Sequence, residues 1–494
     1  FLFRIAPGAA LTLLAGAAAL ALGAQVGLIS PAGAAFGAIL ALAATIGALS
    51  LRLEAIHLAA FGAALVGLFV LSGQDSAAIW FTPVAAWAGA LFLGIAAIRV
   101  PDLGARGLAL AGAGVLAPLF AIAALHWSGH GLASPLAAAG ALIATAAGFG
   151  AIIAASASRG ARTLASLKLT LWLLAGGAFV AIAAAIALMG AAHVAACAFM
   201  TFALALLALD RRWPDSVWRT LAWCAGALAA LNAGAAALLV LREAGDPLFQ
   251  LGFGFAAPIL LAGACAYLAH RQPAPATAAF FEALLLTLLV TGGSLTLRVL
   301  ASGGALMLTP VSFAEAGLHI TLWLVISLLA AARFRHGAHS VRLGAAMLLG
   351  ALALAASLAA MFLWLTPYWS ARTPGAEAGP LLQFDALGFL APGIMFWAHW
   401  VLWRGRGANL RTRLSLGAGA LMLAAMVTLL AAQTADPEAA GSDWVGAIVG
   451  AIAFSLAIGL NFARGVTMNS ARRPSYFEED LQGQRRRQTR RYTR

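Results

Sequence analysis

Polar side chains recur along one apolar stretch of the chain at the spacing of a helical face. The intervals are four, three and four residues in the set Thr287, Thr291, Ser294 and Arg298. A helix places residues at these intervals on one side. The chain then returns with Glu315 and His319, four residues apart at the start of the next apolar stretch. We therefore expect Arg298, Glu315 and His319 to lie at one depth and to pair.

This group has two interpretations. Ionisable residues inside a membrane are costly and are frequently functional, so the group could bind an anion, gate a pathway or relay a proton. The alternative is a structural ion pair that fixes two helices near the membrane interface. We favour the structural pair for Arg298 and Glu315, and keep all six residues as candidates for a ligand or ion-pair site.

Histidines offer two further candidate sites. His126 and His130 are four residues apart and could bind a metal together with His193, as three histidines do in some zinc sites. No carboxylate follows them closely, so we expect no metal. His399 lies among tryptophans and could be an axial ligand of a haem or a chlorophyll-type pigment. We expect it to be an interface anchor instead, and we predict no cofactor.

Recognisable catalytic motifs are absent from the sequence. It contains no P-loop, no GxSxG, no HExxH and no acidic pair in a soluble loop. The three cysteines, Cys197, Cys224 and Cys265, lie in apolar segments without a CxxC spacing, so they predict no disulfide framework. The sequence therefore does not identify an enzyme class.

The composition indicates the elements that must position these residues. Hydrophobic residues make up 63% of the 494 and charged residues only 10%, whereas a soluble domain carries about 25% charged residues. A spanning helix needs about 20 apolar residues. We predict an all-α polytopic membrane bundle of about 16 transmembrane helices in residues 1–465, without a soluble domain. The predicted helices are 5–27, 31–50, 54–73, 78–98, 106–126, 133–156, 165–189, 191–209, 217–241, 250–270, 278–300, 313–333, 342–366, 381–403, 413–433 and 443–463.

The basic residues predict an orientation. If the helices alternate, nearly all arginines fall in connections on one side, and the other side holds only Arg242, Arg298 and Arg372. Cytoplasmic loops carry such an excess. We therefore expect a bacterial inner-membrane protein with both given ends in the cytoplasm. Because the chain begins with Phe1 rather than Met, we also expect residues before it.

Residues 466–494 form a polar, basic tail that ends in several arginines. Basic segments beside a membrane helix are attracted to anionic lipid. We expect a disordered cytoplasmic tail held on anionic lipid, with docking on an acidic partner protein as the alternative. The net charge of +13 is spread over this tail and short loops, so it does not predict a nucleic-acid partner.

Several stretches carry a family resemblance. They run from Phe281-Glu282 to Leu297-Arg298 and from Phe313 through Glu315 and His319 to Trp323, with further similarity at Gly27–Pro31 and Thr366–Trp369. In these stretches the chain resembles the bacterial membrane family called domain of unknown function 2339. The resemblance implies many transmembrane helices and an additional N-terminal region, and it implies no mechanism.

Three function classes follow. The first is a scaffold or accessory subunit of a larger membrane assembly with membrane-protein partners, which we favour because no site motif is present. The second is a transporter or flippase that uses the polar face from Thr287 to Arg298 with Glu315 and His319. The third is an enzyme that acts on a lipid-linked substrate at the outer face.

Overall fold

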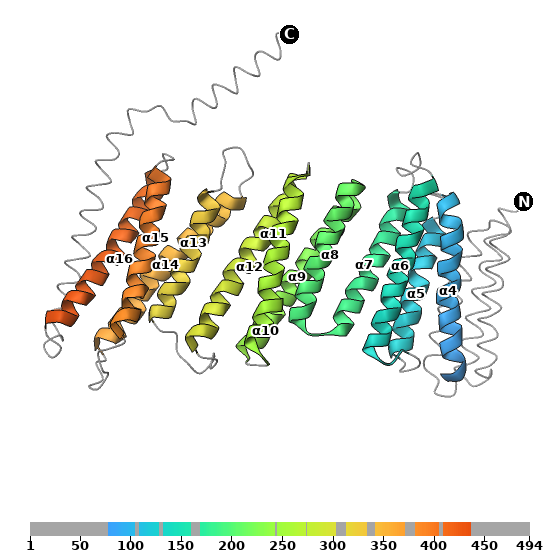
Figure 1. Ribbon diagram of the computed structural model, residues 1–494, viewed down its shortest axis with the longest axis horizontal. Helices are drawn as coiled ribbons and strands as arrows, with labels where there is room; N and C mark the ends of the chain where they lie inside the picture. Colours follow the sequence, from blue (N-terminus) through green and yellow to red (C-terminus); the bar gives the residue numbers. More distant parts are fainter. Residues whose placement is uncertain are drawn as a thin grey trace, which may run out of the picture. The chain divides into compact units, whose positions relative to one another are not determined.

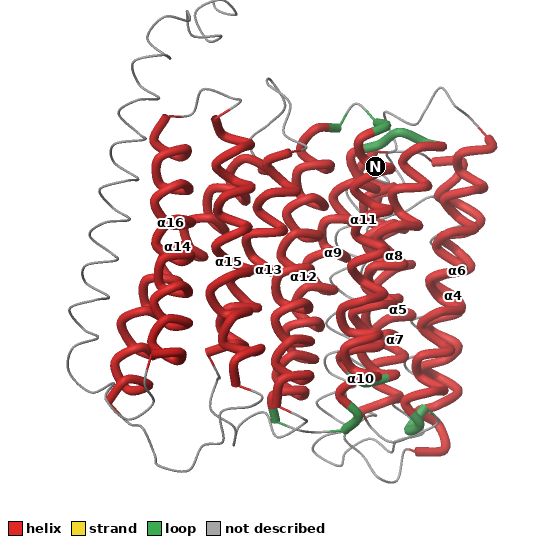
Figure 2. Tube along the Cα trace, turned by 60° about the vertical axis from the view of Figure 1, so that its left-hand side comes forward, coloured by secondary structure: helices red, strands yellow, loops and turns green. Residues whose placement is uncertain are grey.

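The described part of the chain is helical throughout. The computed structural model describes residues 78–103, 108–127, 132–159, 168–242, 245–272, 274–302, 313–332, 341–370, 381–404 and 409–435, and these contain no strand (Figure 2). Its elements are α4 (Ala78–Leu103), α5 (Leu108–Trp127), α6 (Pro135–Arg159), α7 (Lys168–Met189), α8 (Ala192–Arg212), α9 (Ser216–Leu241), α10 (Pro247–Leu251), the π-helix η3 (Gly252–Ala256), α11 (Ala257–His270), α12 (Pro275–Ser302), α13 (Phe313–Ala332), α14 (Val341–Ser370), α15 (Leu381–Arg404) and α16 (Asn409–Ala435) (Figure 1).

These elements match the predicted helices one for one between residues 78 and 435, because α10, η3 and α11 together occupy the predicted helix 250–270. The all-α class is thereby confirmed for this part. The predicted helices 5–27, 31–50, 54–73 and 443–463 and the tail 466–494 lie outside the described residues.

Most of the described helices are long and apolar enough to cross a membrane. Nine candidate spans lie within the described residues, from Leu110–Trp127 to Val341–Ala360. Large apolar side chains such as Leu231, Leu260 and Leu300 are exposed on these helices. Lipid can cover such side chains and water cannot do so favourably. The chain is a multi-pass membrane protein.

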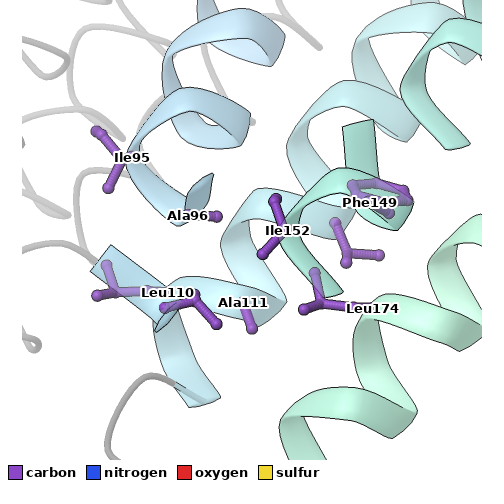
Figure 3. Close-up of a cluster of buried hydrophobic side chains, with 9 residues drawn as sticks. Ile95, Ala96, Leu110, Ala111, Phe149, Ile152 and Leu174 are labelled. Atoms are coloured by element: carbon purple, nitrogen blue, oxygen red, sulfur yellow. The ribbon is translucent and has the colours of Figure 1, made fainter. Parts of the chain in front are cut away.

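The chain divides into two compact units, 1–232 and 233–494. In the first unit, α4 packs on α5 and α6 packs on α7, with further contacts of α4 with α6 and of α5 with α7. Their shared core contains Ile95, Leu110, Phe149 and Leu174 (Figure 3). Small residues allow this close approach, since a Cβ added at Gly177 would lie 2.5 Å from Val115 Cγ1.

In the second unit, α12 and α13 are the most widely connected helices. Helix α12 contacts α11, α13 and α14, and α13 contacts α14 and α15, while α16 packs along α15 (Figures 1 and 2). Ile320, Leu324, Ala353, Phe396 and Ala418 form one core of this unit. Helix α12 therefore has neighbours on several sides along its length, and the candidate site residues lie on it and on these neighbours.

The first span of the second unit has an irregular turn. Asp246 caps α10 by accepting a hydrogen bond from the backbone N–H of Leu248. Five residues of π-helix, η3, then precede α11, and Pro258 follows in its first turn. Phe255 of η3 packs against Gly292 of α12, where an added Cβ would lie 2.8 Å from Phe255 Cβ. The wide turn and the glycine bring the two helices close together at this level.

Candidate functional site at the two ends of helix α12

The predicted pairing of Arg298 with Glu315 is present in the structure. Arg298 Nη1 donates to Glu315 Oε2 at 2.8 Å, and His319 Nε2 lies 3.5 Å from Glu315 Oε1. The Glu315 side chain is 2% exposed, Arg298 is 15% exposed and His319 is 19% exposed. The structure brings together the three residues predicted to lie at one depth.

Local structure explains why the carboxylate lies at this position. Arg298 is in the last two turns of α12, and Glu315 is in the first turn of α13. The first turn of a helix carries partial positive charge and unpaired N–H groups, so it favours a carboxylate. Glu315 therefore receives favourable electrostatics from its own helix and from Arg298, which balances part of the penalty of its burial.

The four residues of the polar face predicted along α12 do not share one set of contacts. Ser294 Oγ accepts a hydrogen bond from Trp323 Nε1 of α13 at 3.1 Å. The hydroxyl groups of Thr287 and Thr291 instead donate to carbonyls one turn earlier in α12, those of Ala283 and Thr287. Both threonine side chains are exposed. Ser294 and Arg298 therefore hydrogen-bond to α13, whereas the hydroxyl groups of Thr287 and Thr291 bond within α12.

A second arginine, glutamate and histidine set lies at the other end of α12. Arg342 of α14 donates to Glu282 from Nε at 2.9 Å and also from Nη2. His270 Nε2, at the end of α11, contacts both Glu282 Oε1 and Arg342 Nη2. The exposed fractions are 12% for Glu282, 33% for Arg342 and 48% for His270. This set is more open than the one around Glu315.

Sequence reasoning did not find the second set as a cluster. Glu282 is separated by 12 residues from His270 and by 60 from Arg342. The spacing of residues along one helix cannot predict contacts among His270, Glu282 and Arg342, because they lie on three different helices. The available signal was the Glu282 carboxylate inside an apolar segment, because a charged group in a membrane needs a partner that offsets the cost of its burial.

His399 joins three helices through a buried contact. Its Nε2 lies 3.0 Å from Ser327 Oγ of α13, and its Nδ1 lies 2.9 Å from the Met395 carbonyl in α15. Ser327 Oγ donates in turn to the carbonyl of Ala346 in α14 at 2.7 Å. His399 is 4% exposed. Both ring nitrogens contact groups of the protein, so an axial ligand role would require one of these contacts to break.

The predicted histidine trio is only partly described. His126 Nδ1 donates to the Leu132 carbonyl at 2.8 Å, and His193 is buried on α8. His130 lies outside the described residues. Within the described ranges, no group of three histidine, cysteine, aspartate or glutamate residues could hold a metal ion.

The remaining carboxylates with described side chains are engaged at helix termini. Asp210 pairs with Arg219 Nε at 3.0 Å and accepts from the backbone N–H of Asp215. Asp215 accepts from the backbone N–H of Val217 at the start of α9. Together with the cap at Asp246, each of these groups fixes a helix end.

Comparison with known proteins adds no relative. No protein-family model matches this chain, and neither a curated protein nor a solved structure matches it. The resemblance to domain of unknown function 2339 stays a prediction based on the stretches that include Glu282, Arg298, Glu315 and His319.

Proposed function

We propose that this multi-pass membrane protein is a scaffold or accessory subunit of a larger membrane assembly and does no chemistry of its own. One observation carries the proposal. Every carboxylate whose side chain the structure describes either pairs with an arginine or caps a helix N-terminus. A general base or a substrate-binding carboxylate has to face its substrate. Carboxylates used to fix helices are the expected pattern of a structural subunit.

We also propose a location in a bacterial inner membrane with both given ends in the cytoplasm. Three connections at one end of the second unit, α11–α12, α13–α14 and α15–α16, are flanked by Arg271, Arg342, Arg404 and Arg411. At the opposite end Arg298 is paired with Glu315. An excess of arginine at one end supports a cytoplasmic assignment of that end.

The experiment for this proposal is gentle solubilisation from native membranes, followed by native electrophoresis, mass spectrometry and an absorption spectrum of the band. We expect migration with fixed partners at constant stoichiometry, and no absorption beyond that of the protein. A colourless band at the mass of a monomer or dimer would contradict the scaffold function.

A second candidate, a transporter or flippase, is favoured by the π-helix η3 beside Gly292. Irregular helix turns inside a membrane span often mark functional sites. Here the irregular turn packs directly on α12, because Phe255 occupies the space in front of Gly292.

The flippase function can be tested with a labelled lipid as the probe. The full chain is reconstituted into vesicles that contain a trace of fluorescent phosphatidylglycerol, and dithionite then bleaches the outer leaflet. About half of the fluorescence remains if no lipid crosses, which is the result expected of a scaffold. Loss of the protected half in protein-containing vesicles, but not in empty ones, would replace the scaffold proposal with the flippase.

A further inference from the structure

We propose that His270, Arg271 and Arg342 form a binding site for the headgroup of an anionic phospholipid. The site lies where α11 ends and where α12 and α14 begin, all in the second unit. It is separate from the basic tail, which lies outside the described residues, and it does not depend on the scaffold proposal.

The first argument is depth. Hydropathy alone places one candidate span at Pro247–His270, a second at Pro275–Ala301 and a third at Val341–Ala360. His270 is the last residue of the first span, and Arg342 is the second residue of the third. Phospholipid headgroups lie directly outside the apolar layer. The imidazole and the guanidinium are therefore at headgroup level.

The second argument is charge. Glu282 holds the Arg342 guanidinium through hydrogen bonds from two of its nitrogens. The Arg271 guanidinium lies 4.5 Å from the centroid of the exposed Tyr267 ring. Among the described side chains, no carboxylate forms an ion pair with Arg271. Two guanidinium groups against one carboxylate leave a net positive charge, which attracts a phosphate.

The third argument is accessibility and shape. The His270 and Arg342 side chains are partly open, and Arg271 is exposed. Arg342 is also in the first turn of α14, where backbone N–H groups and the helix dipole favour an anion. Tyr267 adds an aromatic ring of the kind that is enriched at membrane interfaces. An acyl chain below the headgroup would meet apolar helix surface.

The experiment measures binding of phosphatidylglycerol to the delipidated full chain in detergent, with native mass spectrometry as the readout. We expect phosphatidylglycerol to bind more tightly than phosphatidylcholine. Arg271→Gln should weaken phosphatidylglycerol binding about fivefold, the effect of about one surface charge. Arg271→Lys, which keeps the charge, should retain most of the affinity.

The matched control is Arg404→Gln. Arg404 ends α15 and lies 5.3 Å from the centroid of the Trp400 ring, so it has the same arginine-on-aromatic arrangement, on a helix that carries none of His270, Glu282 and Arg342. The tail contributes equally to all of these variants. Equal losses in Arg271→Gln and Arg404→Gln would overturn the proposal in favour of general surface attraction.

Two more results would also overturn it. Equal affinity for phosphatidylglycerol and phosphatidylcholine would exclude recognition of the anionic headgroup. Complete competition by millimolar inorganic phosphate would show that the site binds the free anion rather than lipid. Unfolding temperatures of the variants in detergent identify any loss that arises from misfolding, because Arg271 is exposed and its replacement should leave the fold unchanged.

Discussion

The two ends of α12 carry the same three residue types in different surroundings. At one end Glu315 is 2% exposed and lies between Arg298 and His319. At the other end Glu282 lies with Arg342 and His270, whose side chains are 33% and 48% exposed. Between Glu282 and Arg298 the helix rises about 24 Å, less than the hydrocarbon thickness of about 30 Å. Both sets therefore lie near an interface of the membrane.

The difference teaches how burial changes the role of an ion pair. A buried pair contributes little net stability, but the loss of one partner leaves a charge without compensation. A partly exposed pair loses much of its attraction to solvent screening, while its charges stay available to an external ligand. We therefore interpret the Glu315 set (Arg298, Glu315 and His319) as a structural ion pair that fixes α12 to α13. We interpret the Glu282 set (His270, Glu282 and Arg342) as a surface that can bind an anion.

The largest effect is expected from Glu315→Ala, which tests the ion pair between α12 and α13. Removal of this carboxylate leaves Arg298 largely buried without its partner, and we expect the free energy of unfolding to fall by about 3–5 kcal/mol. The measurement is unfolding of the purified protein in mixed micelles with increasing SDS, followed by tryptophan fluorescence.

The control for Glu315→Ala replaces both partners. Arg298→Met combined with Glu315→Leu fills a similar volume without charge, and such replacements are often neutral. We expect the double variant to recover most of the stability. A double variant as unstable as Glu315→Ala would show that the charges have a role beyond fixing the two helices.

The second effect concerns the middle of α12, between the two ion-paired ends, where Gly292 packs on Phe255 of η3. Gly292→Ala places a Cβ 2.8 Å from Phe255 Cβ, and neither backbone can move without displacing a packed helix. Overpacking of this kind lowers stability by about 1–3 kcal/mol. The same SDS titration measures it.

Gly263→Ala in α11 is the matched control for this substitution, because no heavy atom lies within 4 Å of an added Cβ there. It should leave stability unchanged or raise it slightly, since alanine favours helix more than glycine does. If the two substitutions had equal effects, the contact between η3 and α12 would not be tight.

The third effect tests the buried hydrogen-bonded contact of Ser327 with His399 and Ala346, which joins three helices and includes no ion pair. Ser327→Ala removes the hydroxyl that joins His399 of α15 to the Ala346 carbonyl of α14. Buried groups that lose a partner reduce stability by about 1–3 kcal/mol. We expect a loss in this range, measured as a lower unfolding temperature.

Ser357→Ala is its control. Ser357 is equally buried, but its hydroxyl donates only to the Ala353 carbonyl of its own helix in the contacts that the structure records. Its removal should have a clearly smaller effect. Similar losses for both serines would mean that the contact between helices adds nothing to stability.

The smallest effect is expected at the end of α12 that carries Glu282, where the Arg342 and His270 side chains are partly exposed. Arg342→Gln removes a partner of Glu282 that solvent already screens, so the free energy of unfolding should fall by about 0.2–1 kcal/mol. The SDS titration at low and at high salt measures this change, which should shrink in high salt. A loss as large as that of Glu315→Ala would remove the distinction between the two ends.

The helices of the described residues and the pairing of Arg298 with Glu315 could be predicted from the sequence, because both depend on local patterns. Apolar runs of about 20 residues set the helices, and a short connection brings Arg298 next to Glu315, 17 residues later. The contacts of Glu282 with Arg342 could not be predicted, because the two residues are 60 positions apart. The packing of the helices decides which of them become neighbours. The η3 turn was also missed, since hydropathy does not distinguish a π turn from an α turn.

The positions of the two partners along the chain have a consequence for biosynthesis. Helix α12 leaves the ribosome with Glu282 and Arg298 before either of their arginine or glutamate partners has been made. Arg298 acquires its partner as soon as α13 begins, whereas Glu282 meets Arg342 only when α14 has started. Of the two described partners of Glu282, His270 is the one made before α12. Because solvent at the membrane interface screens Glu282 during this interval, we expect α12 to enter the lipid before α14 is made. A ribosome stalled before Arg342 should therefore leave α12 and α13 embedded in the membrane and resistant to extraction.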